Sequence, residues 1–420
     1  MEERNLRQLL HESLQVDQMQ LLDLVREAAT GQGMPLYMVG GAVRDLVMGR
    51  RLNDFDLIVV DDAIVLARSL ASKHGGGVTA HTRFGTAKWF LPEPFKASHE
   101  ALDLISARSE TYRHPAALPT VQRGSITDDL LRRDFTINAM AIRLDDPHFG
   151  ELRDDLHGML DLEQGLIRVL HPGSFMDDPT RMYRAVRYAA RYGFRLADED
   201  TLTLIPAALA YVEKLSPQRI RHELDLVLDE PNAISILRQL DELGLLAAVH
   251  PSLAGFDRSR FATLHSDDPL LQDRNPRWIL WLMHLPAQEI EFVHERLHFS
   301  ADLLRSIRSA ALLNANAAAI RGLKPSEAVE VLEGYSFKAL EVVSSAIEDG
   351  PIKDTLSAYL SRWRHIKPGT TGHDLKKRGV APGPRYAEIL RRLRAAWLDG
   401  EVTSEEGEKK ILEEMLGKAG

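Results

Sequence analysis

The chain has 420 residues, no cysteine and a formal net charge of −9, with 44% hydrophobic and 27% charged residues. This composition is typical of globular proteins, and the length suggests about three domains. The absence of cysteine excludes disulfides and thiolate metal sites, and the acidic net charge argues against a surface that is basic throughout. The N-terminal segment lacks a signal-peptide pattern and no segment is apolar enough to span a membrane, so we predict a cytoplasmic protein.

The first part of the chain alternates short apolar runs with glycine turns. An amphipathic helix is predicted over the first thirty residues. A Gly-Gly turn at 40–41 and a short helix at 42–48 follow the first strand. The predicted strands are 36–39, 55–60, 86–91 and 101–107, with weaker candidates at 139–144 and 166–170.

After Pro172 the strand signals fade, and helical periodicity with polar breaks continues to the end. The breaks fall at Ser216-Pro217, Glu230-Pro231, Pro269 to Pro276, Lys324-Pro325 and Gly350-Pro351. We therefore predict an α+β fold, with an N-terminal head on a small mixed sheet followed by an all-α neck, body and tail. The predicted domains are the head at 1–150, the neck at 151–230, the body at 231–350 and the tail at 351–420.

Two carboxylates stand at the start of the second predicted strand. Asp54 and Asp56 are two residues apart, so alternation puts their side chains on one face while Phe55 points into the core. Two such carboxylates are typical of a magnesium site. An isolated Asp-x-Asp more often marks a solvated turn, but the strands and the glycine turn nearby favour a two-metal site for phosphoryl transfer.

The glycine turn is the candidate triphosphate site. Gly40 and Gly41 follow a strand and precede a helix with Arg44 and Asp45, so backbone amides can approach a phosphate closely. Asp103, in the strand at 101–107, is the candidate third carboxylate, which would complete the metal site or accept the proton of the attacking hydroxyl. The alternative for Asp103 is an acid at a strand end that only faces water.

The segment RRDFTINA at 132–139 is a second candidate for nucleotide binding. Two arginines beside an acid and an amide can contact phosphate and ribose hydroxyls together. The alternative is an ion pair at a helix end. The residues concerned are Arg132, Arg133, Asp134 and Asn138.

The segment DDPTR at 177–181 predicts a helix start, because aspartate precedes a proline there. Asp178 and Arg181 are three residues apart and therefore share a helix face. A carboxylate accepts from an exocyclic amine and a guanidinium donates to ring acceptors, so this pair can select cytosine or adenine and reject uracil and guanine. The alternative is that an aspartate caps the helix and pairs with Arg181.

Two further groups of basic residues are candidates for contacts with phosphate. Arg184, Arg187 and Arg191 continue a stripe from Arg181 at helical spacing, although such a stripe is usually the solvated face of a helix. Positions 361–397 contain ten Lys or Arg and two acids. The candidate RNA-binding residues there are Lys376, Lys377, Arg378, Arg385, Arg391 and Arg392.

Together these segments resemble the class II tRNA nucleotidyltransferases, a family of CCA-adding, CC-adding and A-adding enzymes that includes bacterial poly(A) polymerases. GGAVRD with DFD resembles the family's metal and triphosphate motif, RRDFTINA its ribose motif, and DDPTR its base-reading motif. DLHGMLDLEQGLIRVL resembles the head–neck junction, with Asp161 at the position of an acid linked to head movement. SPQRIRHEL resembles the helix that supports the base-reading motif. Asp177 replaces the usual Glu, and Gly158-Met159 replaces a common Gly-Gly.

This resemblance covers about 37–228 and implies a polymerase-β-like head in which Asp54 and Asp56 hold two Mg²⁺ ions. It also implies that CTP and ATP are substrates for extension of the tRNA 3′ end without a nucleic-acid template. The C-terminal region resembles the tail that holds the tRNA elbow, and we expect neither a membrane nor a protein partner.

The segment at 108–129 resembles the full-length loop that helps family members change from CTP to ATP, which argues against a CC-adding enzyme. The narrower alternative is an enzyme that adds only A, followed by a poly(A) polymerase and a catalytically inactive RNA-binding relative. The helical arm has no His-Asp cluster typical of a metal-dependent phosphohydrolase.

Overall fold

The computed structural model of the protein describes residues 5–52, 56–93, 95–97, 100–256, 273–348 and 350–417. The chain divides into two compact units, Met1–Glu223 with Ser235–Val249, and Leu224–Ile234 with His250–Gly420. The division into four domains stays a prediction. Within these described ranges, none of the helices combines the length and apolar character that crossing a membrane requires.

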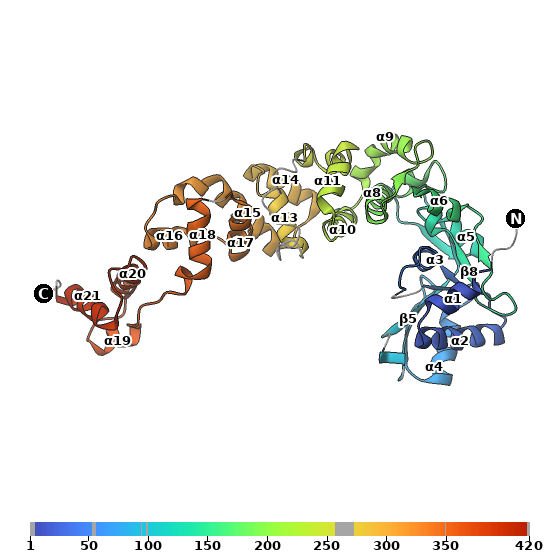
Figure 1. Ribbon diagram of the computed structural model, residues 1–420, viewed down its shortest axis with the longest axis horizontal. Helices are drawn as coiled ribbons and strands as arrows, with labels where there is room; N and C mark the ends of the chain where they lie inside the picture. Colours follow the sequence, from blue (N-terminus) through green and yellow to red (C-terminus); the bar gives the residue numbers. More distant parts are fainter. Residues whose placement is uncertain are drawn as a thin grey trace. The chain divides into compact units, whose positions relative to one another are not determined.

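A mixed sheet is the centre of the first unit, and across the described residues it has seven strands in the order β3-β4-β5-β2-β1-β8-β9. Strands β2 and β5 are parallel, whereas the other neighbours are antiparallel. Figure 1 shows the strands in the blue and cyan part of the chain. The predicted α+β class is thus confirmed. The strands are β1 (Leu36–Val39), β2 (Leu57–Val59), β3 (Gly77–His81), β4 (Thr86–Phe90), β5 (Ala101–Ser106), β8 (Ala141–Arg143) and β9 (Leu152–Arg153).

The two faces of this sheet are covered differently. Alternation sends Leu57 and Leu104 into the main core of the head, which the helices α2 (Val16–Gly31) and α4 (Ala63–His74) help to form. Ile58 belongs to a smaller cluster on the other face, which includes side chains from α5 (Ile126–Leu131). The second face therefore has less apolar cover.

Several boundaries differ from the prediction. The first strand is found as expected, but 55–60 shortens to β2, and Phe55 lies outside the described residues. The N-terminal helix is two helices, α1 (Arg7–Ser13) and α2, separated by a break at Leu14 and Gln15. The arm after Pro172 is not all helical, because β11 (Arg195–Leu196) pairs in parallel with β10 (Leu166–Ile167).

The sequence analysis also missed a hairpin in the segment expected to be a loop. Strands β6 (Arg108–Thr111) and β7 (Thr120–Arg123) pair in an antiparallel manner outside the main sheet. Neither strand contains a fully buried residue, so they lack the apolar alternation that would have revealed them.

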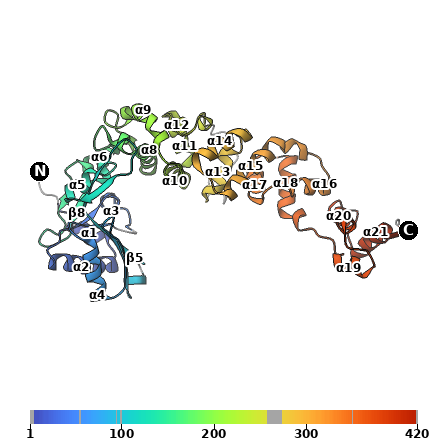
Figure 2. The same ribbon diagram turned by 180° about the vertical axis from the view of Figure 1, so that it is seen from behind.

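Three of the five predicted proline breaks mark helix starts, since proline is tolerated in the first helical turn, and Pro269 of another lies outside the described residues. Helices α10, α16 and α18 begin at Pro217, Pro325 and Pro351. Figures 1 and 2 show α15 beside both α13 and α17. From the head–neck junction onward the helices are α6 (Gly158–Gln164), α7 (Ser174–Asp177), α8 (Thr180–Tyr192), α9 (Ile205–Ala208), α10 (Pro217–Leu228), α11 (Ala233–Glu242), α12 (Leu245–Val249), α13 (Arg274–Leu282), α14 (Ala287–Leu297), α15 (Ala301–Asn316), α16 (Pro325–Leu332), α17 (Phe337–Ala346), α18 (Pro351–Ser361), α19 (Gly372–Lys377), α20 (Pro384–Leu398) and α21 (Glu405–Gly417).

Candidate active site

Two of the three predicted catalytic acids lie on neighbouring parallel strands. Leu57 of β2 is opposite Leu104 of β5, and extending this register by one residue puts Asp56 beside Asp103. Neighbouring strands are about 4.8 Å apart, so the two backbones are close. The third acid, Asp54, lies outside the described residues. The parallel pairing thus joins two acids that are distant in sequence.

The exposure and surroundings of these acids suit a divalent cation. Alternation places Asp56 and Asp103 on the face opposite the main core, and both are exposed. The Asp103 carboxylate forms an ion pair with Lys88 Nζ at 3.3 Å. Hard carboxylate oxygens are the ligands that Mg²⁺ prefers, so these residues fit the predicted ion. The described residues contain no group of three metal-binding side chains, but Asp54 is not among them.

The glycine turn next to this face is tightly constrained. Gly40 has a φ of +65°, and a Cβ there would lie 2.3 Å from Arg133 Nη1. Its N–H donates to the carbonyl oxygen of Met140 at 3.1 Å. The turn leads into α3 (Gly41–Val47), which carries Arg44 and Asp45. A side chain at residue 40 would therefore be excluded by both the backbone conformation and the neighbouring arginine.

Residues of the two predicted nucleotide motifs form one hydrogen-bonded chain. Arg44 Nη1 donates to Asn138 Oδ1 at 2.6 Å, and its Nε donates to Asp45 Oδ1 at 2.9 Å. Asn138 Nδ2 donates to Asp134 Oδ1 at 2.9 Å. Arg184 Nε of α8 donates to Asp134 Oδ2 at 2.9 Å. This chain connects the glycine-turn helix to the neck helix α8.

The electrostatics of this chain favour its charged state. Burial alone would raise the pKa of the Asp134 carboxyl, but Arg184 and Asn138 lower it overall. Burial would likewise lower the pKa of Arg184, whereas the negative charge of Asp134 raises it overall. The two groups therefore stay ionised as a partly buried pair.

The arginines expected to contact phosphate are largely occupied by internal partners. Arg44 is only 6% exposed, and Arg133 Nη2 donates to Asp129 Oδ2 at 2.9 Å. The predicted arginine stripe on α8 needs correction, because it is not a continuous solvated face: Arg184 pairs with Asp134 and Arg187 is buried. Direct phosphate contact by these side chains stays a prediction.

The predicted base-reading residues are both fixed by hydrogen bonds. Asp178 Oδ1 accepts from the Thr180 backbone N–H at 3.0 Å and from Arg219 Nη2 at 2.6 Å. Arg181 Nη1 donates to Ser174 Oγ at 2.7 Å, and its Nη2 donates to the Arg132 carbonyl oxygen at 2.8 Å. Asp178 therefore binds the first backbone N–H of α8, although Pro179 and not Asp178 is the N-cap residue of that helix. Base reading by Asp178 remains a prediction. The expected pairing partner, Arg181, is held by other groups.

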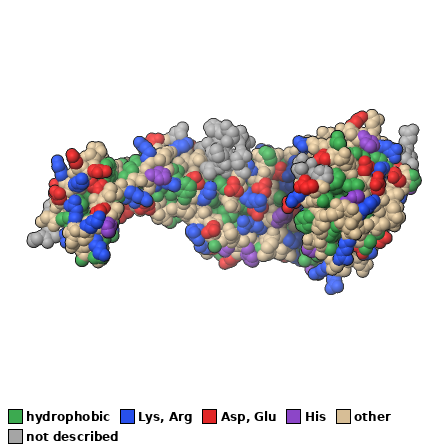
Figure 3. All heavy atoms as spheres, turned by 90° about the horizontal axis from the view of Figure 1, so that it is seen from below, with side chains coloured by type: hydrophobic (Ala, Val, Ile, Leu, Met, Phe, Trp, Pro, Cys, Tyr) green, Lys and Arg blue, Asp and Glu red, His purple; other side chains and the backbone are tan. Residues whose placement is uncertain are grey.

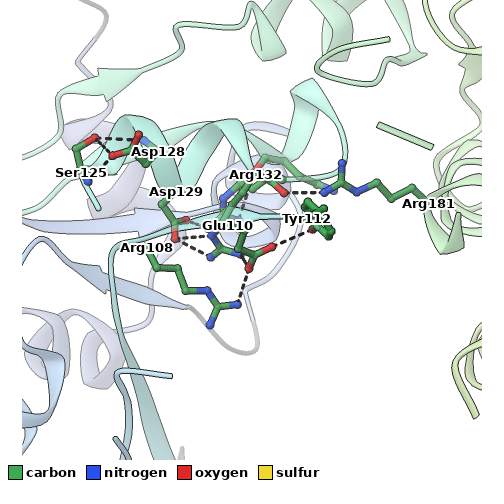
Figure 4. Close-up of polar contacts among 10 residues, drawn as sticks. Arg108, Glu110, Tyr112, Ser125, Asp128, Asp129, Arg132 and Arg181 are labelled. Carbon is green, nitrogen blue, oxygen red and sulfur yellow. Dashed lines mark hydrogen bonds and ion pairs between the residues drawn. The ribbon is translucent and has the colours of Figure 1, made fainter. Parts of the chain in front are cut away.

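A residue that the sequence analysis missed, Glu110 of β6, supports the Arg181 side of this site. Figure 4 shows its carboxylate between Arg108, Arg132 and Tyr112. Both arginines donate to Glu110 Oε1 at 3.0 Å, and Tyr112 Oη donates to Oε2 at 3.1 Å. Burial is the main cause that raises the pKa of Tyr112 to about 12, and Glu110 adds to this shift, whereas the positive charge of Arg181 opposes it. No pattern in the sequence separated Glu110 from the other acids.

The tip of the hairpin contacts the base-reading segment directly. The Ala116 N–H donates to the Met176 carbonyl oxygen at 3.0 Å, and the Ala116 carbonyl accepts from Arg219 Nη1 at 3.1 Å. Arg219 therefore bridges the hairpin and Asp178. It lies in α10, within the SPQRIRHEL segment, and this resemblance was the only signal for it in the sequence.

The junction between head and neck is closely packed. Asp161 is 2% exposed and accepts from Thr136 Oγ1 at 2.6 Å and from Arg168 Nε at 3.1 Å. A Cβ on Gly158 would lie 2.4 Å from the Thr136 carbonyl oxygen. Met159, at the position where the family resemblance predicts a second glycine, is buried in the core of the head. Close packing thus requires the first glycine of this pair but accommodates a large side chain at the second.

The candidate RNA-binding residues of the tail are all exposed, on α19 and α20 or next to them. Arg392 is paired with Glu401 at 2.6 Å. On the face shown in Figure 3, acidic and basic side chains are interspersed over the helical part of the chain. The basic side chains of the tail are therefore individually exposed, and RNA binding there stays a prediction.

Comparison with known proteins places these motifs in a family. Residues 36–168 match the Poly A polymerase head domain, and residues 193–256 match the probable RNA and SrmB-binding site of polymerase A. The A-adding tRNA nucleotidyltransferase of Halalkalibacterium halodurans is 34% identical over 98% of this chain and 96% of its own. The CC-adding tRNA nucleotidyltransferase of Deinococcus radiodurans is 31% identical over 96% and 94%, respectively.

Solved structures agree with this assignment. A CCA-adding enzyme in an apo form has a TM-score of 0.85 at 30% identity, and the match covers 99% of both chains. The Thermotoga maritima CCA-adding enzyme complexed with tRNA has a TM-score of 0.80 at 28% identity, also over 99% of both chains. Complexes of CCA-adding enzyme with ATP and with CTP each have a TM-score of 0.81. With matching domains, relatives and fold along nearly its whole length, the chain belongs to the class II tRNA nucleotidyltransferase family, which includes CCA-adding and A-adding enzymes and bacterial poly(A) polymerases.

Proposed function

We propose that this protein adds nucleotides from CTP and/or ATP to the 3′ end of tRNA without a nucleic-acid template. The observation that carries the proposal is the parallel register of β2 and β5, which brings Asp56 and Asp103 together on the exposed face of the sheet. This pair adjoins the strand that leads into the Gly40 turn, since β1 neighbours β2. Carboxylates beside a phosphate-binding turn are the arrangement that nucleotidyl transfer requires.

In the proposed reaction, the 3′-hydroxyl of the RNA attacks the α-phosphate of the nucleotide, and pyrophosphate leaves. Asp54 and Asp56 would hold the Mg²⁺ ions, which supply a Lewis acid that stabilises charge on the attacking and leaving oxygens. Asp103 would complete this site or accept the proton of the attacking hydroxyl. Backbone amides of the glycine turn would bind the triphosphate.

Base selection would depend on Asp178 and Arg181. Their fixed positions support this role, because a preorganised donor and acceptor discriminate between bases better than mobile ones. Each side chain keeps atoms for a base, since a carboxylate accepts several bonds and a guanidinium has five N–H groups.

A tRNA substrate fits the tail, where exposed cations would contact phosphates of the elbow. We also place the protein in the cytoplasm.

The test uses tRNA transcripts that end before the first C, after CC, or after the complete CCA, each with labelled CTP or ATP and Mg²⁺. Incorporation into an incomplete end, with none into an unstructured RNA, would support the proposal. Addition of A to the CC end alone would narrow the activity to A addition. Long poly(A) products would identify a poly(A) polymerase. Absence of incorporation on every tRNA would contradict the proposal.

A further inference from the structure

The head contains a cavity whose lining residues have no part in the proposed reaction. It has a volume of about 590 Å³ and lies between the turn before β4 and the tip of the β6–β7 hairpin. Arg83 and Phe84 line it from the turn, and Arg113, His114 and Leu118 from the hairpin. The described residues that line it include no acid. On a chain with a net charge of −9, such a lining favours an anionic ligand.

The side chains at this cavity combine apolar surface with positive charge. Phe84 is 46% exposed and Leu118 is 77% exposed, although most large apolar side chains are buried in folded proteins. The guanidinium carbon of Arg83 lies 5.5 Å from the centroid of the Phe84 ring. Proteins that bind single-stranded nucleic acids combine exposed aromatic side chains with arginines, because bases stack on the aromatic rings and the arginines contact phosphates.

Strand register relates the cavity to the catalytic acids. Lys88 of β4 is opposite Asp103, and Phe84 precedes Lys88 by four residues. At about 3.3 Å per residue, Phe84 lies at most about 13 Å along the strand direction from the acids. Stacked nucleotides rise about 3.4 Å each, so this distance corresponds to about four nucleotides. The turn is also anchored, because the Gly85 carbonyl accepts from the Ser106 N–H of β5 at 2.8 Å.

The same sheet order separates the cavity from the predicted triphosphate site. Strand β4 and the Gly40 turn after β1 are three strand positions apart, which is about 14 Å. The catalytic acids lie on the strands between them. An RNA end that approaches from β4 and a nucleotide bound beyond β1 would therefore meet at the acids.

We propose that this cavity binds the single-stranded 3′ end of the RNA being extended, about four nucleotides before its terminus. One base stacks on Phe84, and Arg83 and Arg113 contact the adjoining phosphates. The inference rests on the proposed function, because it assumes an RNA substrate. It assigns the cavity to the RNA and not to the incoming nucleotide.

The test compares substitutions of two exposed phenylalanines. Phe84→Ala should raise KM for tRNA and weaken tRNA binding about tenfold, because one stacked base is lost, while KM for ATP stays unchanged. Phe84→Trp keeps an aromatic face and should retain binding. Phe292→Ala, at a residue of α14 that is 42% exposed, is the matched control and should leave both KM values unchanged. Thermal melting should show that each variant is folded.

The arginines provide a second measurement. The double substitution of Arg83→Gln and Arg113→Gln should lower the slope of log affinity against log salt by about two, because two phosphate contacts are removed. An unchanged tRNA affinity in Phe84→Ala, or an equal rise of KM for ATP, would overturn the inference. If the wild-type protein extends no tRNA, the proposed function fails, while the tRNA-binding titration still decides whether this cavity holds RNA.

Discussion

The acids on the sheet and the acid at the start of α8 have different surroundings. Asp56 and Asp103 are exposed, and Asp103 is paired with the exposed Lys88. Asp178, by contrast, accepts from both Thr180 and Arg219. An exposed carboxylate can exchange its partner for a metal ion at little cost, whereas a carboxylate that accepts from several fixed donors keeps its orientation. The difference suggests chemistry at the first site and selection at the second.

The largest expected effect is at the sheet. Asp56→Ala should lower incorporation of both CTP and ATP by at least about a thousandfold, because a metal ligand contributes several kcal/mol to the transition state. Binding of tRNA should be nearly unchanged, since the proposed role of Asp56 is to hold an ion and not RNA. Steady-state incorporation and a binding titration measure the two effects. The control is Asp198→Ala, at an acid whose side chain is 75% exposed, and it should keep full activity. Near wild-type activity of Asp56→Ala would remove the metal-site assignment.

The next largest effect is expected on the free energy of unfolding, at the hydrogen-bonded residues that connect the head to α8. Asp134→Ala leaves Arg184 without its carboxylate partner in a partly buried position, and breaking this pair should cost up to about 3 kcal/mol. Denaturant unfolding monitored on this variant should show that loss. Asp198→Ala breaks an exposed pair with Arg195 and should cost less than about 1 kcal/mol. Equal losses in the two variants would contradict the structural role of Asp134.

The pKa of Asp134 adds a pH dependence to this prediction. Although burial raises it, Arg184 and Asn138 lower the folded-state pKa overall, so the protein gains stability from this group above its unfolded pKa of about 3.9. That stability is lost as the pH falls from this value through the lower folded-state pKa. Unfolding of Asp134→Ala should therefore depend less on pH below about 4 than unfolding of the wild type.

Much of this site was predictable because local spacing determines it. Three of the proline breaks and the first strand follow from the properties of nearby residues, and short motifs identified Asp56 and Asp178 as candidates. The contribution of Glu110 and Arg219 was not predictable, because it depends on the pairing of β6 with β7 and on the packing of α10. Those contacts join residues far apart in sequence. The sequence did suggest Asp103 as a third carboxylate, but only the parallel register places it beside Asp56.

Helical spacing alone did not predict the surroundings of the arginines on α8. It correctly put Arg181, Arg184 and Arg187 on one helix, but it gave no information about their partners. In the structure Arg181 and Arg187 are buried, and Arg184 pairs with Asp134. Periodicity identifies a face, whereas the neighbours of that face are set by tertiary packing.

A smaller effect, on selectivity, is expected in the neck. Arg181→Ala should relax rejection of UTP and GTP about ten- to a hundredfold relative to the correct nucleotide, since one good base contact is worth about 1–3 kcal/mol of discrimination. Competition among the four nucleotides on one tRNA measures this. The substitution also removes hydrogen bonds to Ser174 and Arg132, so melting must be measured beside it. A variant that is less stable but equally selective would show that Arg181 has only a structural role.

The smallest expected effect concerns Arg219, which would influence base selection through Asp178. Arg219→Ala removes the bridge between Asp178 and the Ala116 carbonyl, while the Thr180 hydrogen bonds to Asp178 remain. Asp178 should then be less well oriented, which lowers discrimination about threefold to tenfold. Arg219→Lys keeps a cation that can reach one of the two oxygens, so its loss should be intermediate. Arg195→Ala, at an exposed arginine, is the matched control. If Arg219 only stabilises the helix, Arg219→Ala should lower the melting temperature without changing the ratio of kcat/KM values among nucleotides. If the ratio is unchanged while Asp178→Ala does alter it, Asp178 reads the base without help from the hairpin.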